Sequence, residues 1–107
     1  MYKVKYLPLA LDDLKSIVKY IAYTLDAPRT VEKFLVKFDK EILKIESNPF
    51  RCPVYYSPEK LKYEYRVLHI DNYSLFFTID NKYIEVHRVI HSKRDIVNIL
   101  KSAEKTP

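Results

Sequence analysis

The arrangement of apolar residues constrains the fold of this chain most, because its period changes from helical to strand-like beyond residue 60. Between residues 11 and 45, apolar side chains recur at steps of three and four, the spacing of one helix face. After Tyr63 they alternate with polar residues, the period of a half-buried strand. Amphipathic helices need a flat apolar surface to cover, so the later strands are expected to form a sheet beneath them.

Residues that start and stop helices divide the first half into two helices. Pro8 is expected to open the first, with Asp12 and Asp13 in its first turn, where negative charge favours the helix dipole. Asp26 is expected to cap the second helix, and Pro28 to lie in its first turn. The connection is short, which predicts an antiparallel hairpin. The two apolar stripes are Leu11, Leu14, Ile17, Val18, Ile21 and Leu25, then Val31, Phe34, Leu35, Phe38, Ile42 and Ile45.

The remaining pattern predicts strands and a short last helix. The expected strands cover residues 2–6, 63–70, 73–79 and 83–90, the last three joined as successive hairpins. A loop is expected from about Pro49 to Lys60. Asp95 is expected to cap a short helix that ends near Leu100.

Together these elements predict an α+β fold: an N-terminal strand and a two-helix antiparallel hairpin packed on one face of a small antiparallel sheet, with a short C-terminal helix. The length suits one domain, expected over residues 1–100, and residues 101–107 are expected to form a polar tail that frays. The chain has no glycine, so its turns are expected to use residues that tolerate positive φ. These are Asn48, Asp71-Asn72 and Asp80-Asn81.

Composition narrows the setting and the class of partner. The chain has one cysteine, Cys52, so neither a disulfide nor a clustered metal site is expected, and nothing points to a cofactor. No apolar run is long enough to span a bilayer and no secretory signal is evident, so a cytoplasmic protein without a membrane partner is expected. A net charge of +5 fits a polyanionic partner, but the positions of the charged residues have to decide whether such a partner is bound.

Five strings, in this order along the chain, resemble a known family. They are Tyr2 to Tyr6 through Pro8, Ala10, Asp13 and Leu14; Ile17 with Tyr20-Ile21-Ala22; Phe34 to Ile45 with Asn48-Pro49; Tyr65-Arg66-Val67 through Asn72-Tyr73 and Phe76-Phe77; and Arg88 to Asp95. Their order and spacing resemble the RelE/ParE toxin superfamily over nearly the whole chain. The resemblance implies the toxin of a type II toxin–antitoxin system, also described as a plasmid stabilisation protein, which a cognate antitoxin neutralises.

The family resemblance leaves two mechanisms open. Some members bind the ribosome and cleave messenger RNA as metal-independent endoribonucleases, whereas others inhibit DNA gyrase. The candidate site residues are Arg66, Arg88, His91, Lys93 and Arg94, expected to converge for target or nucleic-acid binding. In a nuclease, Arg66, Arg88, His91 and Arg94 would be catalytic, since cations stabilise a pentacovalent phosphate and a histidine moves protons.

Each candidate also has a structural interpretation. Arg66 and Arg88 could instead pair with Glu64, Glu85 or an acidic antitoxin residue, and His91 could be a hydrogen-bonding group at a strand end. His69 and His87 are interpreted as structural.

Three departures weaken the nuclease hypothesis. Ser74 stands where ribosome-dependent members typically carry an arginine, Glu64 falls near a lysine position, and Leu100 lies where some members have a tyrosine. A carboxylate repels phosphate, so Glu64 cannot replace a lysine. The sequence therefore lies slightly nearer the ParE-like branch, with a detoxified antitoxin-binding module as a further alternative.

Overall fold

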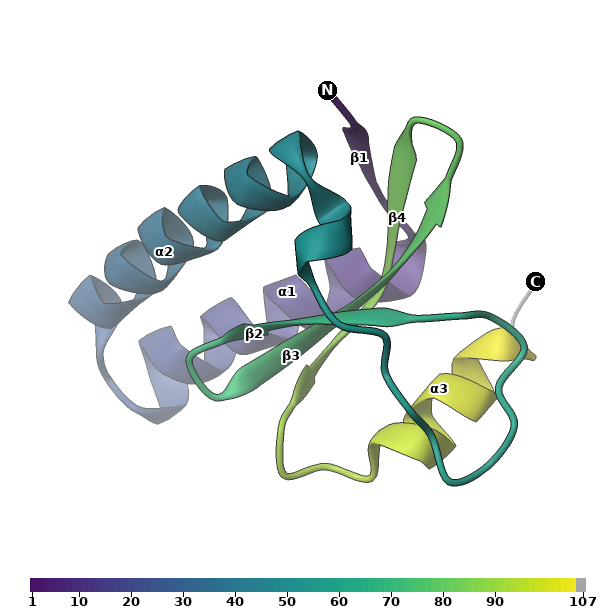
Figure 1. The fold of residues 1–107 in the computed structure, drawn as a ribbon. Helices are drawn as coiled ribbons and strands as arrows, with labels where there is room; N and C mark the ends of the chain where they lie inside the picture. The colour runs from purple at the N-terminus through teal and green to yellow at the C-terminus, as the bar shows by residue number, and fades with distance from the viewer. Residues whose placement is uncertain (106–107) are drawn as a thin grey trace.

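The computed structural model describes residues 1–105, and the α+β class is confirmed (Figure 1). The elements in chain order are β1 (Lys3–Tyr6), α1 (Pro8–Lys19), the π-helical turn η1 (Tyr20–Thr24), α2 (Pro28–Ser47), the 3₁₀ turn η2 (Pro49–Arg51), β2 (Arg66–Ile70), β3 (Tyr73–Asp80), β4 (Tyr83–His91) and α3 (Ile96–Glu104). The predicted strand from Tyr63 starts only at Arg66, where its pairing with β3 begins opposite Phe77.

The sheet has the order β1-β4-β3-β2. Its β2–β3 and β3–β4 pairs are antiparallel, as the sequence predicted. β1, however, pairs with β4 in parallel, so the sheet is mixed rather than purely antiparallel. A parallel pair needs a long crossover, and the helical hairpin lies within the chain that connects these two strands.

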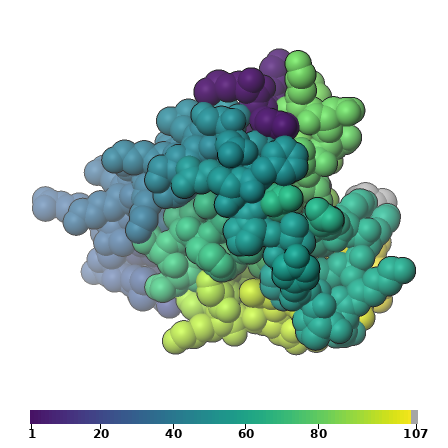
Figure 2. All heavy atoms as spheres, in the orientation of Figure 1, coloured from purple at the N-terminus to yellow at the C-terminus, as the bar shows by residue number. Residues whose placement is uncertain are grey.

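Apolar side chains cover both faces of the sheet, which corrects the expectation that helices pack on one face only. On one face, Phe34, Phe38 and Ile45 of α2 pack in a cluster with Leu75 and Phe77 of β3. The opposite face carries a second cluster, which contains Tyr65, Val67, Phe76, Ile90 and Leu100. There α3 lies beside the long loop that precedes β2, as the space-filling view shows (Figure 2).

Aspartate and asparagine provide the positive-φ positions of this glycine-free chain. Asp71 and Asn81, with φ of 52° and 54°, form the β-hairpin turns as predicted. Asp26 also has a positive φ, 50°, so it does not cap α2, whose N-cap is Ala27 without a side-chain hydrogen bond. Asn48 does not have the expected positive φ, since its backbone is extended with φ of −156°. It caps η2 instead, where its side chain accepts a hydrogen bond from the Phe50 amide at 3.2 Å.

The last helix reaches further than the sequence predicted. α3 begins after its Asp95 cap, as expected, but continues to Glu104 instead of ending near Leu100. Glu104 accepts hydrogen bonds from the Tyr65 hydroxyl (2.8 Å) and the Lys62 amide (2.9 Å), which fix the predicted tail as far as that residue. Residues 106–107 of that tail lie outside the described residues. Within the described part, no helix is long and apolar enough to cross a membrane.

A bulge in β4 places His87 against two tyrosine rings. Phe76 faces Arg88 while Phe77 faces Val86, so His87 is the extra residue of the bulge. Its ring lies 5.3 Å from both Tyr63 and Tyr65, and its Nε2 is 2.9 Å from the Thr78 hydroxyl. Burial lowers the pKa of His87 below its ordinary value of 6.5, which supports the structural interpretation of this residue.

The lowered pKa predicts that His87 makes folding depend on pH. The unfolded chain binds a proton at a higher pH than the folded chain, so the stability that His87 contributes is present above pH 6.5 and falls as the pH drops below it. We expect His87→Gln to lose less stability between pH 7.5 and 5.5 than the unmodified chain, measured by urea unfolding. His69→Gln, at an exposed strand position, is the matched control. An unchanged pH dependence in His87→Gln would contradict the prediction.

Candidate target-binding and antitoxin-binding site

The carboxylate of Asp13 joins α1 to the end of β4. Arg88 donates to both of its oxygens, from Nε to Oδ2 at 2.7 Å and from Nη2 to Oδ1 at 2.8 Å. The Val89 amide donates to Oδ2 at 2.9 Å. Both side chains are mostly buried, and hydrogen bonding to Asp13 raises the pKa of Arg88 above its ordinary value. Arg88 therefore holds two elements together, with a partner other than the Glu64 or Glu85 that the sequence suggested.

This contact lies where β1 no longer pairs with β4. β1 pairs with β4 only as far as Val86, whose carbonyl accepts from the Leu7 amide. Beyond the bulge, the Val89 amide would point away from the sheet without a strand partner, and Asp13 supplies the acceptor. A signal for this was present in the sequence. Asp13 lies three residues after Ala10 and four before Ile17, both buried, so it occupies a core-facing position that demands a partner.

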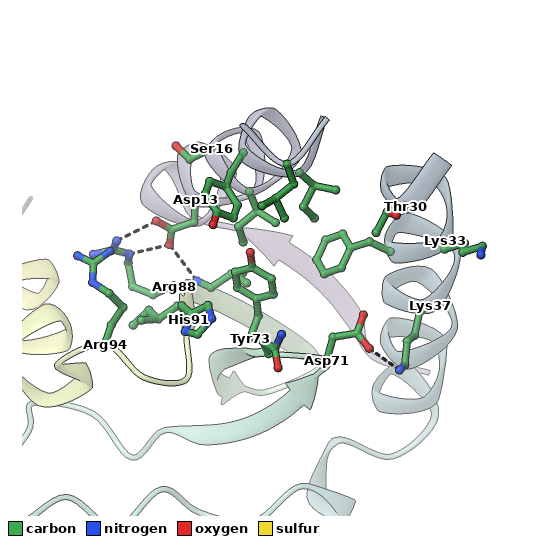
Figure 3. A pocket seen from close by; sticks show the side chains of 18 of the residues that line it. Asp13, Ser16, Thr30, Lys33, Lys37, Asp71, Tyr73, Arg88, His91 and Arg94 are labelled. Atoms are coloured by element: carbon green, nitrogen blue, oxygen red, sulfur yellow. Dashed lines mark hydrogen bonds and ion pairs between the residues drawn. The ribbon is translucent and has the colours of Figure 1, made fainter. Parts of the chain in front are cut away.

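A groove of about 1010 Å³ opens beside this contact, between the helical hairpin and the ends of β3 and β4 (Figure 3). Tyr73 points into its middle, with Arg94 and His91 toward one end and Thr30 and Lys33 toward the other. Its apolar and aromatic lining residues are Ile17, Tyr20, Ile21, Leu25, Phe34, Tyr73, Val89, Ile90 and Ile99. The sequence alone did not predict this surface, because its residues come from six separate elements.

The free charge in the groove is positive. Its two lining carboxylates are both engaged, Asp13 by Arg88 and Asp71 by Lys37 of α2. Among the described residues, no carboxylate pairs with Lys33 or Arg94. The groove thus combines an apolar floor with unpaired cations at both ends, which suits a partner with apolar and acidic side chains.

The predicted site residues come together only in part. Arg88, His91 and Arg94 line the groove, whereas Lys93 lies in the same turn but does not. Arg66 lines a separate hollow with Glu64, so the predicted convergence of Arg66 with the other cations is wrong.

Arg66 makes its contacts away from the groove. Its Nη1 donates to the Cys52 carbonyl at 2.6 Å, and its guanidinium lies 5.0 Å from the Phe50 ring centre. The Cys52 side chain is buried within the loop that the sequence predicted.

Ser74 and Leu100, two of the departures noted in the sequence, have structural roles. The Ser74 hydroxyl is 1% exposed and lies 3.0 Å from both the His69 ring and the Ser92 hydroxyl. It thereby links β2 and β3 to the turn after β4. Leu100 is fully buried against the second face of the sheet. His91 accepts at Nδ1 from the Lys93 amide at 3.2 Å, which helps to hold the basic turn.

Comparison with known proteins places the chain in a family. A family model described as the ParE toxin of the type II toxin–antitoxin system, parDE, matches residues 4–96. The chain belongs to the ParE toxin family. One solved structure with the ParE-family fold, the chromosomal ParDE toxin–antitoxin system from P. aeruginosa, is 18% identical and superimposes with a TM-score of 0.69 over 87% of this chain and 98% of that chain. A search of curated proteins found no match.

Among the described residues, no three histidine, cysteine, aspartate or glutamate side chains gather as metal ligands. The candidate site of this ParE-family chain is a groove whose lining offers apolar contact, hydrogen bonding and attraction of negative charge.

Removal of Asp13 should test how far the groove depends on the contact between α1 and β4. We expect Asp13→Ala to lower the free energy of unfolding by about 3 kcal/mol, because it leaves Arg88 and the Val89 amide without their acceptor. Asp13→Asn should be intermediate, since its amide oxygen can still accept one bond. Asp12→Asn, at an exposed neighbouring position, should change stability by less than about 0.5 kcal/mol in the same urea titration. Equal losses at positions 12 and 13 would refute this role.

Proposed function

We propose that this chain arrests the growth of its host cell by inhibiting DNA gyrase, and that its cognate antitoxin neutralises it. The observation that carries the proposal is the match to the ParE toxin family over residues 4–96. The distribution of cations supports this choice over messenger RNA cleavage. A nuclease must direct several cations and a proton carrier at one phosphate, and here Arg66 is occupied elsewhere while Arg88 is bound to Asp13.

Purified chain should therefore inhibit gyrase supercoiling and leave messenger RNA intact. Expression in cells should induce a DNA-damage response, and the effect on gyrase should disappear when the chain is first mixed with its antitoxin. Supercoiling assays with purified gyrase and plasmid DNA measure the first effect. Codon-specific cleavage on isolated ribosomes, without any effect on gyrase, would refute the gyrase mechanism and favour the endoribonuclease.

The antitoxin is proposed to occupy the groove between the helical hairpin and the sheet. An amphipathic segment would place its apolar side chains on Tyr73 and Phe34 and its acidic side chains near Lys33 and Arg94. Because Asp13 and Asp71 are already paired within the chain, they offer little repulsion to such a segment.

Charge reversal at the groove should weaken antitoxin binding. We expect Lys33→Glu to raise the Kd at least tenfold, mainly through slower association, since the loss of a rim cation removes steering. The cognate antitoxin is the partner to measure, by surface plasmon resonance at two salt concentrations. Lys82→Glu, an equally exposed charge change in the β3–β4 turn, should leave the Kd unchanged. Equal weakening by both variants would contradict the proposed location.

A further inference from the structure

The connection between α1 and α2 has an irregular backbone. The Leu25 amide donates to the Tyr20 carbonyl at 3.0 Å, five residues back, which makes this stretch a π-helical turn. The Ala27 amide then donates to the Ile21 carbonyl at 3.1 Å, and Asp26 between them has the left-handed φ of 50° that glycine usually provides. Both irregularities have an energetic cost, and such irregularities are concentrated at functional segments.

The same segment exposes large apolar side chains. Tyr23 is 82% exposed, and Tyr20 and Leu25 are each about half exposed. We call residues 20–26 the hairpin tip; it lies at one extremity of the molecule (Figure 1). Single exposed apolar residues are common on protein surfaces, but here three lie within six residues of an irregular turn. Tyrosine is also the residue type that most often anchors protein interfaces, because it offers a large contact area at a small loss of conformational entropy.

Positive charges flank the hairpin tip. Lys19 precedes it and Arg29 follows it in the first turn of α2, and no carboxylate pairs with either among the described residues. Asp26 adds one negative charge within the tip, so residues 19–29 carry a net charge of +1. A second copy of this chain would bring two surfaces of the same net charge together, which disfavours self-association through the tip. The complementary surface is acidic, with an apolar hollow that accepts an aromatic ring.

The hairpin tip overlaps the groove at only some of its residues. Tyr20 and Leu25 line the groove, whereas Tyr23 does not. A ligand seated in the groove therefore contacts part of the tip and leaves the Tyr23 ring outside the groove lining.

We propose that the hairpin tip is the docking surface for the protein that the toxin inhibits, with Tyr23 as its anchor in an apolar hollow of an acidic surface. This inference rests on the proposed function and adds to it the surface that recognises the target. It also explains neutralisation without a conformational change, because an antitoxin in the groove covers Tyr20 and Leu25 and blocks the tip from the target.

A single substitution separates target docking from folding and from antitoxin binding. Tyr23→Ala removes a ring that is mostly in solvent, so the thermal midpoint and the antitoxin Kd should stay unchanged. We expect growth arrest to require at least tenfold more toxin, and purified gyrase with plasmid DNA to be inhibited at least tenfold less. Tyr56→Ala is the matched control, since Tyr56 is 88% exposed and lies in the loop before β2.

Each outcome of this experiment decides the proposal. The proposal would be overturned if Tyr23→Ala arrested growth as strongly as the unmodified chain. It would also be overturned if Tyr23→Ala lost antitoxin affinity but not toxicity, or if Tyr56→Ala lost as much toxicity as Tyr23→Ala. Salt-sensitive binding of DNA alone that Tyr23→Ala abolishes would assign the tip to nucleic acid and overturn it too. If the unmodified chain arrests growth without affecting gyrase and Tyr23→Ala does not arrest growth, the gyrase mechanism fails and the docking surface stands. If the unmodified chain arrests no growth, both fail.

Discussion

The bond between Asp13 and the end of β4 is the contact on which the arrangement of this molecule depends. One carboxylate engages Arg88 through both oxygens and also satisfies the Val89 amide, so it replaces the missing strand at the edge of the sheet. It thereby fixes α1 against β4 at the border of the groove. The ion pair is mostly shielded from solvent and joins elements far apart in sequence, so its loss would change both stability and the shape of the binding surface.

Local sequence patterns were sufficient for most of the fold, because periodicity and turn residues reflect contacts between neighbours. The helical hairpin, the three-strand meander and the turns at Asp71 and Asn81 follow from such patterns. The parallel β1–β4 pair and the use of both sheet faces do not, since they depend on contacts between distant segments. The extension of α3 to Glu104 escaped prediction for the same reason: its partners, Tyr65 and Lys62, lie in a loop.

The candidate site was less predictable than the fold. The basic string that starts near the end of β4 was recognisable, and the structure places Arg88, His91 and Arg94 of that string at the groove. Arg66 was assigned to the same site from its residue type and its place on a predicted strand, and only the tertiary structure shows that it lies elsewhere. The sequence shows the chemistry of a charged residue but not which residue it pairs with, as Asp13 illustrates.

The parallel pairing of β1 with β4 has a consequence for synthesis. β1 is synthesised before its partner β4, and Asp13 and Arg88 are separated by 75 residues. Neither the sheet nor the groove can close until β4 has been synthesised, and such long-range pairing folds slowly. A nascent chain therefore carries the helical hairpin before it has the β4 side of the groove.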